Sequence, residues 1–350
     1  MKMIRYWFLA LLLFGTFAHA DIPLDGLTLA LHPVGETLVV GGRSRTLYTL
    51  DASTLEVLNR TYLGTTINKL MFSPDGSLLF VQDSEPDIYI LNAETFEQIG
   101  TLGGYGSLSM APDAKLMVAL NRDYDGDTLT LFDTNGLEMK SLTFGEDDDV
   151  SSLGISPDGS KLAVFFDYFE SENEEDVSWS NIPEEYEGFA KDVYAEQHDG
   201  DEARYMLLSL PGLEVLADYV SFYSPREDEL VFFQGDDALI INSSNENARY
   251  SPDGTVEMWA WSSDISAYGS GISADHNILA VGSLADASIM DMANNSEVSF
   301  DLDDLPGWPE YFSSFVIAPS GIIYGATDAH RVVKVTQAGA GVSKEIKPIY

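Results

Sequence analysis

The chain has 350 residues, of which 57 are Asp or Glu and only 18 are Lys or Arg, so its formal net charge at pH 7 is −39. Nucleic-acid binding depends on basic surfaces that neutralise phosphates, and a charge of this sign excludes it. Cysteine is absent, which excludes disulfides, thiolate metal sites and a lipid anchor attached through cysteine.

Residues 1–20 have the organisation of a cleaved signal peptide. Lys2 and Arg5 form a basic start, residues 6–14 are apolar, and Ala18-His19-Ala20 is a small-residue cleavage site. The apolar run is shorter than the roughly 20 residues that a membrane span needs, and no later stretch approaches that length. The mature chain, residues 21–350, is therefore expected in the periplasm or outside the cell.

Removal of the signal peptide makes the protein more acidic, because it takes away two basic residues and no acidic ones. The mature chain keeps 18 − 2 = 16 basic residues against 57 acidic ones, a net charge of −41. One explanation is solubility in a salty medium, where charge repulsion is screened. A cationic partner, or bound divalent ions, is the other.

The predicted elements follow one repeated unit, which is clearest at residues 66–103. Residues 67–72 alternate in polarity, the turn Ser73-Pro74-Asp75-Gly76 follows, and three further β-rich runs cover residues 78–81, 87–92 and 95–102. Alternation at period two between turn residues is typical of half-buried strands, so the unit predicts a four-stranded antiparallel sheet. One such sheet cannot bury both faces and needs neighbours of its own kind.

The turn between the first two strands of the unit recurs along the whole mature chain. Its marker residues are Pro33, Pro74, Pro112, Pro157, Pro225, Ala274 and Pro319. The intervals between them are 41, 38, 45, 68, 49 and 45 residues, which is the period of a propeller blade. A further Ser251-Pro252-Asp253-Gly254 stands too close to its neighbours to begin a blade, and is predicted to be a turn inside blade 5.

The fold prediction is therefore all-β: one seven-bladed β-propeller of four-stranded antiparallel blades over residues 21–350, with one long insertion in blade 4. The chain begins with an innermost strand at residues 27–31 and ends with an outermost strand at residues 344–350. Blades 1 and 7 are thus expected to meet without a shared strand, so that side-chain packing alone closes the ring.

Two stretches resemble the YVTN family of seven-bladed propellers. They are TLYTLDAST at residues 46–54, and SPDGSLLFV with DIYILNAET at residues 73–95. The family's repeat pairs a V-x-V-I-D-x-x-T half with an S-P-D-G-x-x-L-Y-V half. The resemblance covers essentially the whole mature chain, most strongly in blades 1, 2 and 4. It implies architecture and export far more than one activity, since a fold does not fix function.

The insertion in blade 4, residues 166–204, is the outstanding candidate site. In a propeller the loops between second and third strands, and those between blades, share one rim, while the S-P-D-G turns occupy the other. The insertion contains fourteen acidic residues, two basic ones and seven aromatics. Aromatics among carboxylates indicate a segment that packs on its rim or receives a partner. The partner-binding residues expected here are Trp179, Tyr186, Phe189 and Tyr194.

Two alternatives qualify this interpretation of the insertion. The aromatic rings could instead attach it to its own propeller. Residues 181–195 are also expected to form a short helix, with Asn181 as its N-cap and Pro183 in the first turn.

Blade 3 offers a candidate calcium site on the same rim. Asp123, Asp125 and Asp127 alternate in one loop, with four more acids at residues 146–149, and Ca²⁺ prefers oxygen ligands of this kind. The loop departs from the EF-hand pattern, because Gly126 comes one place early and Thr134 stands at the twelfth position. A solvated acidic turn is the alternative.

A small group of basic residues is a candidate anion site. Arg43 and Arg45 lie in a loop of blade 1, and His330 and Arg331 lie in a loop of blade 7, which adjoins blade 1 once the ring closes. The alternative is that these are isolated charges that balance nearby carboxylates.

Catalytic motifs are missing from the sequence. It contains no G-x-S-x-G, no H-E-x-x-H and no Walker loop. The expected function is therefore that of an exported, monomeric, non-enzymatic propeller that binds a protein or small-molecule ligand at the insertion-bearing rim, without a cofactor other than calcium. Three alternatives stay open: a subunit of a periplasmic enzyme complex similar in layout to quinohaem amine dehydrogenase, a lactonase-like propeller enzyme, and a structural or surface-layer protein.

Overall fold

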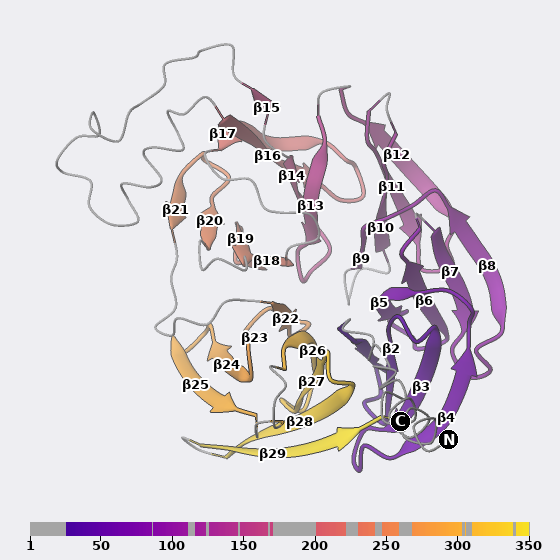
Figure 1. The fold of residues 1–350 in the computed structure, drawn as a ribbon. Helices are drawn as coiled ribbons and strands as arrows, with labels where there is room; N and C mark the ends of the chain where they lie inside the picture. Colours follow the sequence, from indigo (N-terminus) through magenta and orange to yellow (C-terminus); the bar gives the residue numbers. More distant parts are fainter. Residues whose placement is uncertain are drawn as a thin grey trace, which may run out of the picture.

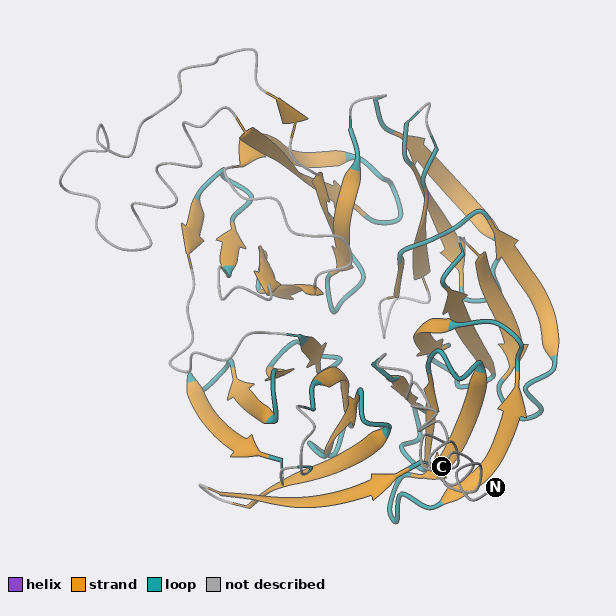
Figure 2. Ribbon diagram, viewed as in Figure 1, coloured by secondary structure: helices purple, strands orange, loops and turns teal. Residues whose placement is uncertain are grey.

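The computed structural model describes residues 26–85, 87–110, 116–123, 126–145, 148–166, 169–170, 201–221, 230–241, 247–258, 268–302, 305, 310–338 and 341–349. Residues 1–20, which are expected to be a signal peptide, lie outside these residues. The described chain folds into seven antiparallel sheets arranged as a ring (Figure 1). None of the described residues is helical (Figure 2), and accordingly no described helix has the length and hydrophobicity to cross a membrane.

The strands of each blade run in sequence order from the centre of the ring to its circumference. Blade 1 comprises β1 (Thr28–Leu31), β2 (Thr37–Gly41), β3 (Thr46–Asp51) and β4 (Val57–Tyr62). Blade 2 comprises β5 (Ile67–Phe72), β6 (Leu78–Asp83), β7 (Asp87–Asn92) and β8 (Gln98–Gly103). Blade 3 comprises β9 (Leu108–Met110), β10 (Leu116–Asn121), β11 (Thr128–Asp133) and β12 (Glu138–Thr143). Blade 4 comprises β13 (Val150–Ile155), β14 (Lys161–Phe166), β16 (Asp201–Ser209) and β17 (Val215–Ser221), with the short β15 (Phe169–Glu170) paired to β16.

The remaining three blades complete the ring in the same order. Blade 5 comprises β18 (Leu230–Gln234), β19 (Asp237–Ile241), β20 (Ala248–Tyr250) and β21 (Val256–Met258). Blade 6 comprises β22 (Gly269–Ile272), β23 (Ile278–Gly282), β24 (Asp286–Asp291) and β25 (Ser296–Asp301). Blade 7 comprises β26 (Phe312–Ile317), β27 (Ile323–Thr327), β28 (Arg331–Ala338) and β29 (Gly341–Pro348). The predicted fold class and blade count are confirmed.

The core of the protein lies between the blades rather than inside any one of them. Each second strand is an apolar run that is buried along most of its length, as in β6 and β14. The buried side chains form seven clusters, and each cluster combines residues of two neighbouring blades. A sheet with two apolar faces is stable only between two others, so the ring is the unit that folds.

The turns between first and second strands share one hydrogen-bond arrangement. In blade 2, Ser73 Oγ donates to Asp75 Oδ1 at 2.7 Å, and Ser73 Oγ accepts the Leu78 N–H at 2.9 Å. The same Asp75 oxygen accepts the Ser77 N–H at 3.0 Å. Bonding by the Ser73 hydroxyl and the Ser77 groups lowers the pKa of Asp75 to about 2. Gly76 completes the turn at φ 73°, a conformation that glycine adopts without steric cost.

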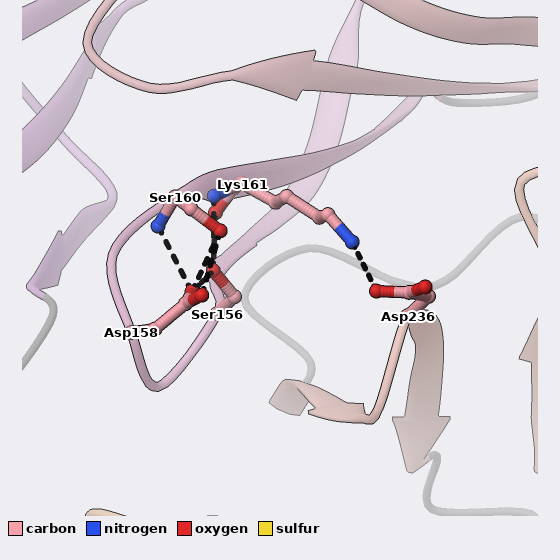
Figure 3. A network of polar contacts seen from close by, with 5 residues as sticks. All are labelled: Ser156, Asp158, Ser160, Lys161 and Asp236. Atoms are coloured by element: carbon pink, nitrogen blue, oxygen red, sulfur yellow. Dashed lines mark hydrogen bonds and ion pairs between the residues drawn. The ribbon is translucent and has the colours of Figure 1, made fainter.

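The equivalent turn of blade 4 also bonds to the next blade. Asp158 accepts hydrogen bonds from Ser156 Oγ and from the N–H and hydroxyl of Ser160. The next residue, Lys161, extends its ammonium group to Asp236 of blade 5 (Figure 3). The turn that stabilises the β13–β14 hairpin therefore also positions a contact between blades 4 and 5.

Lysine side chains form similar contacts between other pairs of neighbouring blades. Five of the six lysines that the structure describes donate to a neighbouring blade. The pairs are Lys140 to Gly212 O, Lys161 to Asp236, Lys334 to Ser53 O, Lys344 to Asp301 O, and Lys347 to Thr54 O. Four of the five acceptors are backbone carbonyls.

Ring closure follows the predicted scheme. β1 and β26 belong to separate sheets, so no strand is shared between blades 1 and 7. Three side chains of blade 7 donate to consecutive carbonyls of the β3–β4 turn: Tyr324 Oη to Ala52 O at 2.9 Å, Lys334 to Ser53 O, and Lys347 to Thr54 O. Polar bonds therefore supplement the apolar packing that the sequence predicted at this seam.

The prediction for blade 5 was wrong in its register. Pro225 was expected in the turn between the first and second strands, but the first strand is β18, which begins at Leu230. The turn is the two-residue pair Gly235-Asp236, closed by Gln234 opposite Asp237, with Gly235 at φ 67°. Pro225 lies outside the described residues, in the connection from blade 4. The prediction that residues 251–254 form a turn within blade 5 is confirmed, since they join β20 to β21.

Candidate functional site

The insertion begins and ends on the rim where the second and third strands of each blade are joined. It leaves the sheet after β14 and returns at β16, whereas the turn at Ser156–Gly159 lies at the other end of β14. The prediction that the insertion and this turn lie on opposite rims is confirmed for the two ends of the insertion. The expected helix and the four expected partner-binding residues, Trp179, Tyr186, Phe189 and Tyr194, lie outside the described residues.

The structure corrects both predicted boundaries of the insertion. Phe166 is 1% exposed and makes an edge-to-face contact with Phe144 in the core between blades 3 and 4, with 5.0 Å between ring centroids. Arg204 lies within β16, opposite Val220 of β17. The sequence could not separate them from the insertion, because an aromatic and a basic residue are compatible with either location. β16 in fact begins at Asp201: Ala203 pairs with Ser221 of β17, and Asp201 and Glu202 pair with the short β15.

Arg204 fixes the base of the insertion to the loop that enters blade 4. Its Nη1 donates to both carboxylate oxygens of Asp148 at 2.9 Å, and its Nε and Nη2 donate to Asp218 at 2.7 and 2.6 Å. The guanidinium carbon lies 5.1 Å from the centroid of the Phe166 ring. Hydrogen bonding to Asp218 and Asp148 raises the pKa of Arg204, so it stays charged. Bidentate contacts of this kind fix orientation as well as distance.

Asp127, one of the predicted calcium ligands, is turned into the protein. Its side chain is buried, and Oδ2 accepts the Val150 N–H at 2.8 Å. Burial raises its pKa, an effect that the Val150 hydrogen bond and the Arg122 charge oppose. Asp127 thus connects the β10–β11 loop to the start of blade 4.

The calcium prediction as a whole remains a prediction. Asp123 is exposed, and Asp125 lies outside the described residues. Within the described ranges, no three acidic or histidine side chains are grouped so that they could hold a metal ion.

Of the four predicted anion-binding residues, Arg43, Arg45 and His330 lie in loops of the adjoining blades 1 and 7. Arg331 is the first residue of β28 and has an acidic partner that the sequence did not reveal. Its Nε donates to Glu310 Oε1 at 2.7 Å and its Nη2 donates to Oε2, while Thr327 Oγ1 donates to Oε1 at 2.5 Å. Glu310 is 3% exposed. Arg331 therefore holds a buried carboxylate, and an anion at this rim would depend on Arg43, Arg45 and His330. Arg45 and His330 both have left-handed backbones, with φ of 59° and 56°.

A cavity of about 460 Å³ lies where the starts of the innermost strands converge, on the same rim as the insertion. Its lining comes from blades 1, 2, 5, 6 and 7 and from the residues that precede them, and its polar part comes from all of these except blade 5, which contributes Leu230 and Val231. The polar lining residues are Thr28, Asn68, Lys69, Gln82, Tyr268, Ser270, Ser313 and Ser314. None of the lining residues described is acidic, although the chain has 57 acidic residues. The sequence did not reveal this cavity, because its residues are spread over five blades with no shared motif.

Several of the polar side chains in this cavity hold the ring together as well. Ser313 Oγ and Ser314 Oγ donate to Leu27 O at 2.6 and 2.9 Å across the closing seam. Gln82 Oε1 accepts the Leu108 N–H at 3.2 Å. Gly271 lets two inner strands approach closely, since a Cβ there would lie 2.2 Å from Phe315 O. The cavity wall is thus rigid, with hydroxyl and amide groups in set positions.

The opposite rim has a cavity lined mainly by apolar side chains. A second cavity of about 390 Å³ lies at the rim of the Ser-Pro-Asp-Gly turns. Its lining includes Leu31, Met71, Phe72, Met110, Ile272, Ile317, Pro33, Pro74 and Pro319. The two cavities share Leu70, Phe315 and Val316, so among the described residues the polar lining gathers toward the insertion-bearing rim and the apolar lining toward the rim of the turns.

Comparison with known proteins supports the fold and leaves the family open. No protein-family model matches the chain, and no curated protein matches it either. Among solved structures, a chain named Kuenenia stuttgartiensis Hydrazine Synthase aligns with a TM-score of 0.61 at 15% identity, over 95% of this chain and 98% of that one. The fold is common, since 1750 chains of solved structures match it. At this identity the likeness establishes a seven-bladed β-propeller and nothing finer.

Proposed function

We propose that this protein is an exported, non-enzymatic β-propeller that binds a protein or small-molecule ligand at the rim bearing the insertion. The observation that carries the proposal is the meeting of two features on one rim: the polar cavity of about 460 Å³, and the ends of the insertion fixed by Arg204. A rigid cavity with convergent polar groups is the usual form of a binding site. Further support comes from the resemblance to the YVTN family and from the signal-peptide pattern of residues 1–20.

The polar groups described in the cavity favour binding over catalysis. They are hydroxyls, amides and one ammonium group, and two of the serines and Gln82 are already bonded to backbone. Both histidines with described turn contacts, His32 and His276, lie on the opposite rim and bond to backbone there. Such groups can recognise a ligand through hydrogen bonds, and the described lining contains no Asp, Glu or His, the side chains that most often act as general acids and bases.

A deletion of residues 167–203 tests the proposal. A short Gly/Ser link between Phe166 and Arg204 continues the existing hairpin, because Phe165 already pairs with Tyr205. Wild type, the deletion variant and a control with Val34→Ser on the opposite rim would be used to capture proteins from a periplasmic extract, while a metabolite mixture from the same cells is tested for co-purifying ligands. Wild type and control should retain the same partner or ligand, and a folded deletion variant should lose it. Retention by all three proteins, or a deletion variant without a cooperative melt, would count against the proposal.

A second candidate function is that of a subunit in an enzyme complex. It is favoured by the alignment along 98% of a chain from a structure named hydrazine synthase, and by the layout shared with quinohaem amine dehydrogenase. Co-purification with a haem- or quinone-bearing protein, seen by visible absorbance, would support it over the first. Lactone hydrolysis by the isolated protein would instead favour a propeller enzyme. Export is tested by N-terminal sequencing of the secreted protein, which should begin at Asp21.

A further inference from the structure

The outermost strands of four consecutive blades share an irregularity. In blade 1, Leu50 pairs with Val57 and Thr49 pairs with Asn59, so Leu58 is left out of the ladder. The same β-bulge occurs between the third and fourth strands of blades 2, 3 and 4. The residues left out are Leu58, Ile99, Met139 and Leu216. We call these four residues the bulge row.

Every member of the bulge row is a large apolar residue that faces solvent. Their exposed fractions are 61% for Leu58, 60% for Ile99, 52% for Met139 and 50% for Leu216. The strands that carry them, β4, β8, β12 and β17, follow one another around the circumference, or outer wall, of the ring, one in each blade (Figure 1). Tyr62, Leu137 and Val215 add exposed apolar surface on the same wall.

Bulges in an outermost strand can be explained as protection against pairing with another chain, but this does not explain why the bulged residues are apolar. A bulge twists an edge strand away from unwanted pairing, and a charged or small side chain would serve that purpose better than leucine. Blades 6 and 7 also show that the bulge is not required by the blade: their outer ladders run unbroken, with Met290 opposite Glu297 and Val335 opposite Lys344. On the described outer strands of these two blades, no large apolar side chain is comparably exposed. Among the described outer ladders, the apolar bulge therefore occurs in blades 1–4 and not in blades 5, 6 or 7.

A glutamate accompanies each member of the row. Glu56, Glu97, Glu138 and Glu214 are exposed, stand one or two residues before the bulge, and form no ion pair with any described residue. Two basic residues of this wall already have contacts, since Lys140 donates to Gly212 O and the Arg60 guanidinium lies 5.9 Å from the Tyr48 ring centroid. Each of blades 1–4 therefore presents one exposed apolar side chain close in sequence to an exposed glutamate.

We propose that the outer wall of blades 1–4 is a docking surface for a basic protein partner that covers the bulge row. The acidic side chains complement a basic surface, and the four apolar side chains would be buried beneath it. A small molecule cannot contact four separate blades, so the partner is a macromolecule. A second copy of the mature chain, whose net charge is 16 − 57 = −41, would repel the first, which disfavours self-association.

The test uses a synthetic peptide of alternating lysine and leucine, labelled for fluorescence anisotropy. Three variants are compared with wild type. The first replaces the bulge row with serine (Leu58→Ser, Ile99→Ser, Met139→Ser, Leu216→Ser), which leaves the net charge unchanged. The second is a matched control with Val34→Ser and Leu284→Ser, two exposed apolar residues away from the wall, at 70% and 43% exposure. The third replaces the four glutamates with glutamine.

The serine variant should melt as wild type does and bind the peptide about tenfold more weakly, because apolar area is lost at four points. The control should bind within about twofold of wild type, and the glutamine variant should bind more weakly with a shallower dependence on salt. Equal binding by wild type and the serine variant would overturn the docking surface. An unchanged salt dependence in the glutamine variant would show that the four glutamates do not attract the basic peptide, and would overturn the electrostatic part of the proposal. Because residues 167–203 are intact throughout, these results are independent of the insertion-rim proposal.

Discussion

The closing seam between blades 1 and 7 gives the sharpest test of how the ring is held together. Tyr324 and Ala52 are 2% and 1% exposed, and the tyrosine hydroxyl donates to the Ala52 carbonyl at 2.9 Å. Tyr324→Phe removes the donor, keeps the ring, and leaves a buried carbonyl without this partner. Loss of the bond together with the unsatisfied carbonyl should lower the free energy of unfolding by about 1–3 kcal/mol.

Tyr219→Phe is the matched control for this substitution. Tyr219 also donates to a backbone carbonyl of the next blade, Ser251 O, at 2.9 Å, but it crosses the seam between blades 4 and 5, which the chain itself connects. Urea unfolding measures the global loss for both variants, and hydrogen exchange locates it. Tyr324→Phe should accelerate exchange in β1 and β26, and Tyr219→Phe should not. Unchanged stability in Tyr324→Phe, or faster exchange spread evenly over the ring, would refute the role assigned to this bond.

Two further predictions concern inner-strand packing and pH. Gly271→Ala should lower the free energy of unfolding by about 3 kcal/mol or more, because its Cβ would overlap the Phe315 carbonyl. Gly106→Ala is the control: its Cβ would lie 3.9 Å from Leu120 O, so it should change the free energy of unfolding by less than about 0.5 kcal/mol in the same thermal melt. Burial lowers the pKa of His276 to about 4, and its Nδ1 accepts the Phe233 N–H at 2.9 Å. A folded pKa below the unfolded value of about 6.5 means that stability is complete above pH 6.5 and falls toward pH 4, by up to about 3 kcal/mol. His276→Gly, which tolerates the local φ of 57°, should flatten the dependence of urea unfolding on pH in this window, and an equal slope in both proteins would contradict the assignment.

Local repetition explains why so much of the fold could be predicted. Each Ser-Pro-Asp-Gly turn is stabilised within itself, as Ser73 and Asp75 show, so its sequence pattern is tied directly to its geometry. Blade 5 is the exception because two signals competed there. Ser224-Pro225 resembled the repeat marker, while the true turn at Gly235-Asp236 is a two-residue hairpin without serine or proline.

The candidate site was less predictable because it depends on contacts between distant parts of the chain. Nothing in the sequence near Glu310 marks it as the partner of Arg331, and nothing near Asp148 marks it as a partner of Arg204. The loops could be assigned to a rim from strand order alone. Which side chains meet on that rim, and the cavity that they line, depend on how seven sheets close into a ring.

The lysines that cross the seams have a consequence for how the protein responds to its surroundings. Four of the five donate to backbone carbonyls, which carry no net charge, so these contacts join the blades without placing two charged side chains together across the seam. Lys347 also lies 3.5 Å from Glu345, within its own blade. The ring is thus held together against the mutual repulsion of 57 acidic residues. Dissolved ions weaken that long-range repulsion more than they weaken short donor–acceptor contacts. The free energy of unfolding should therefore rise with ionic strength, and the propeller should be least stable in fresh water.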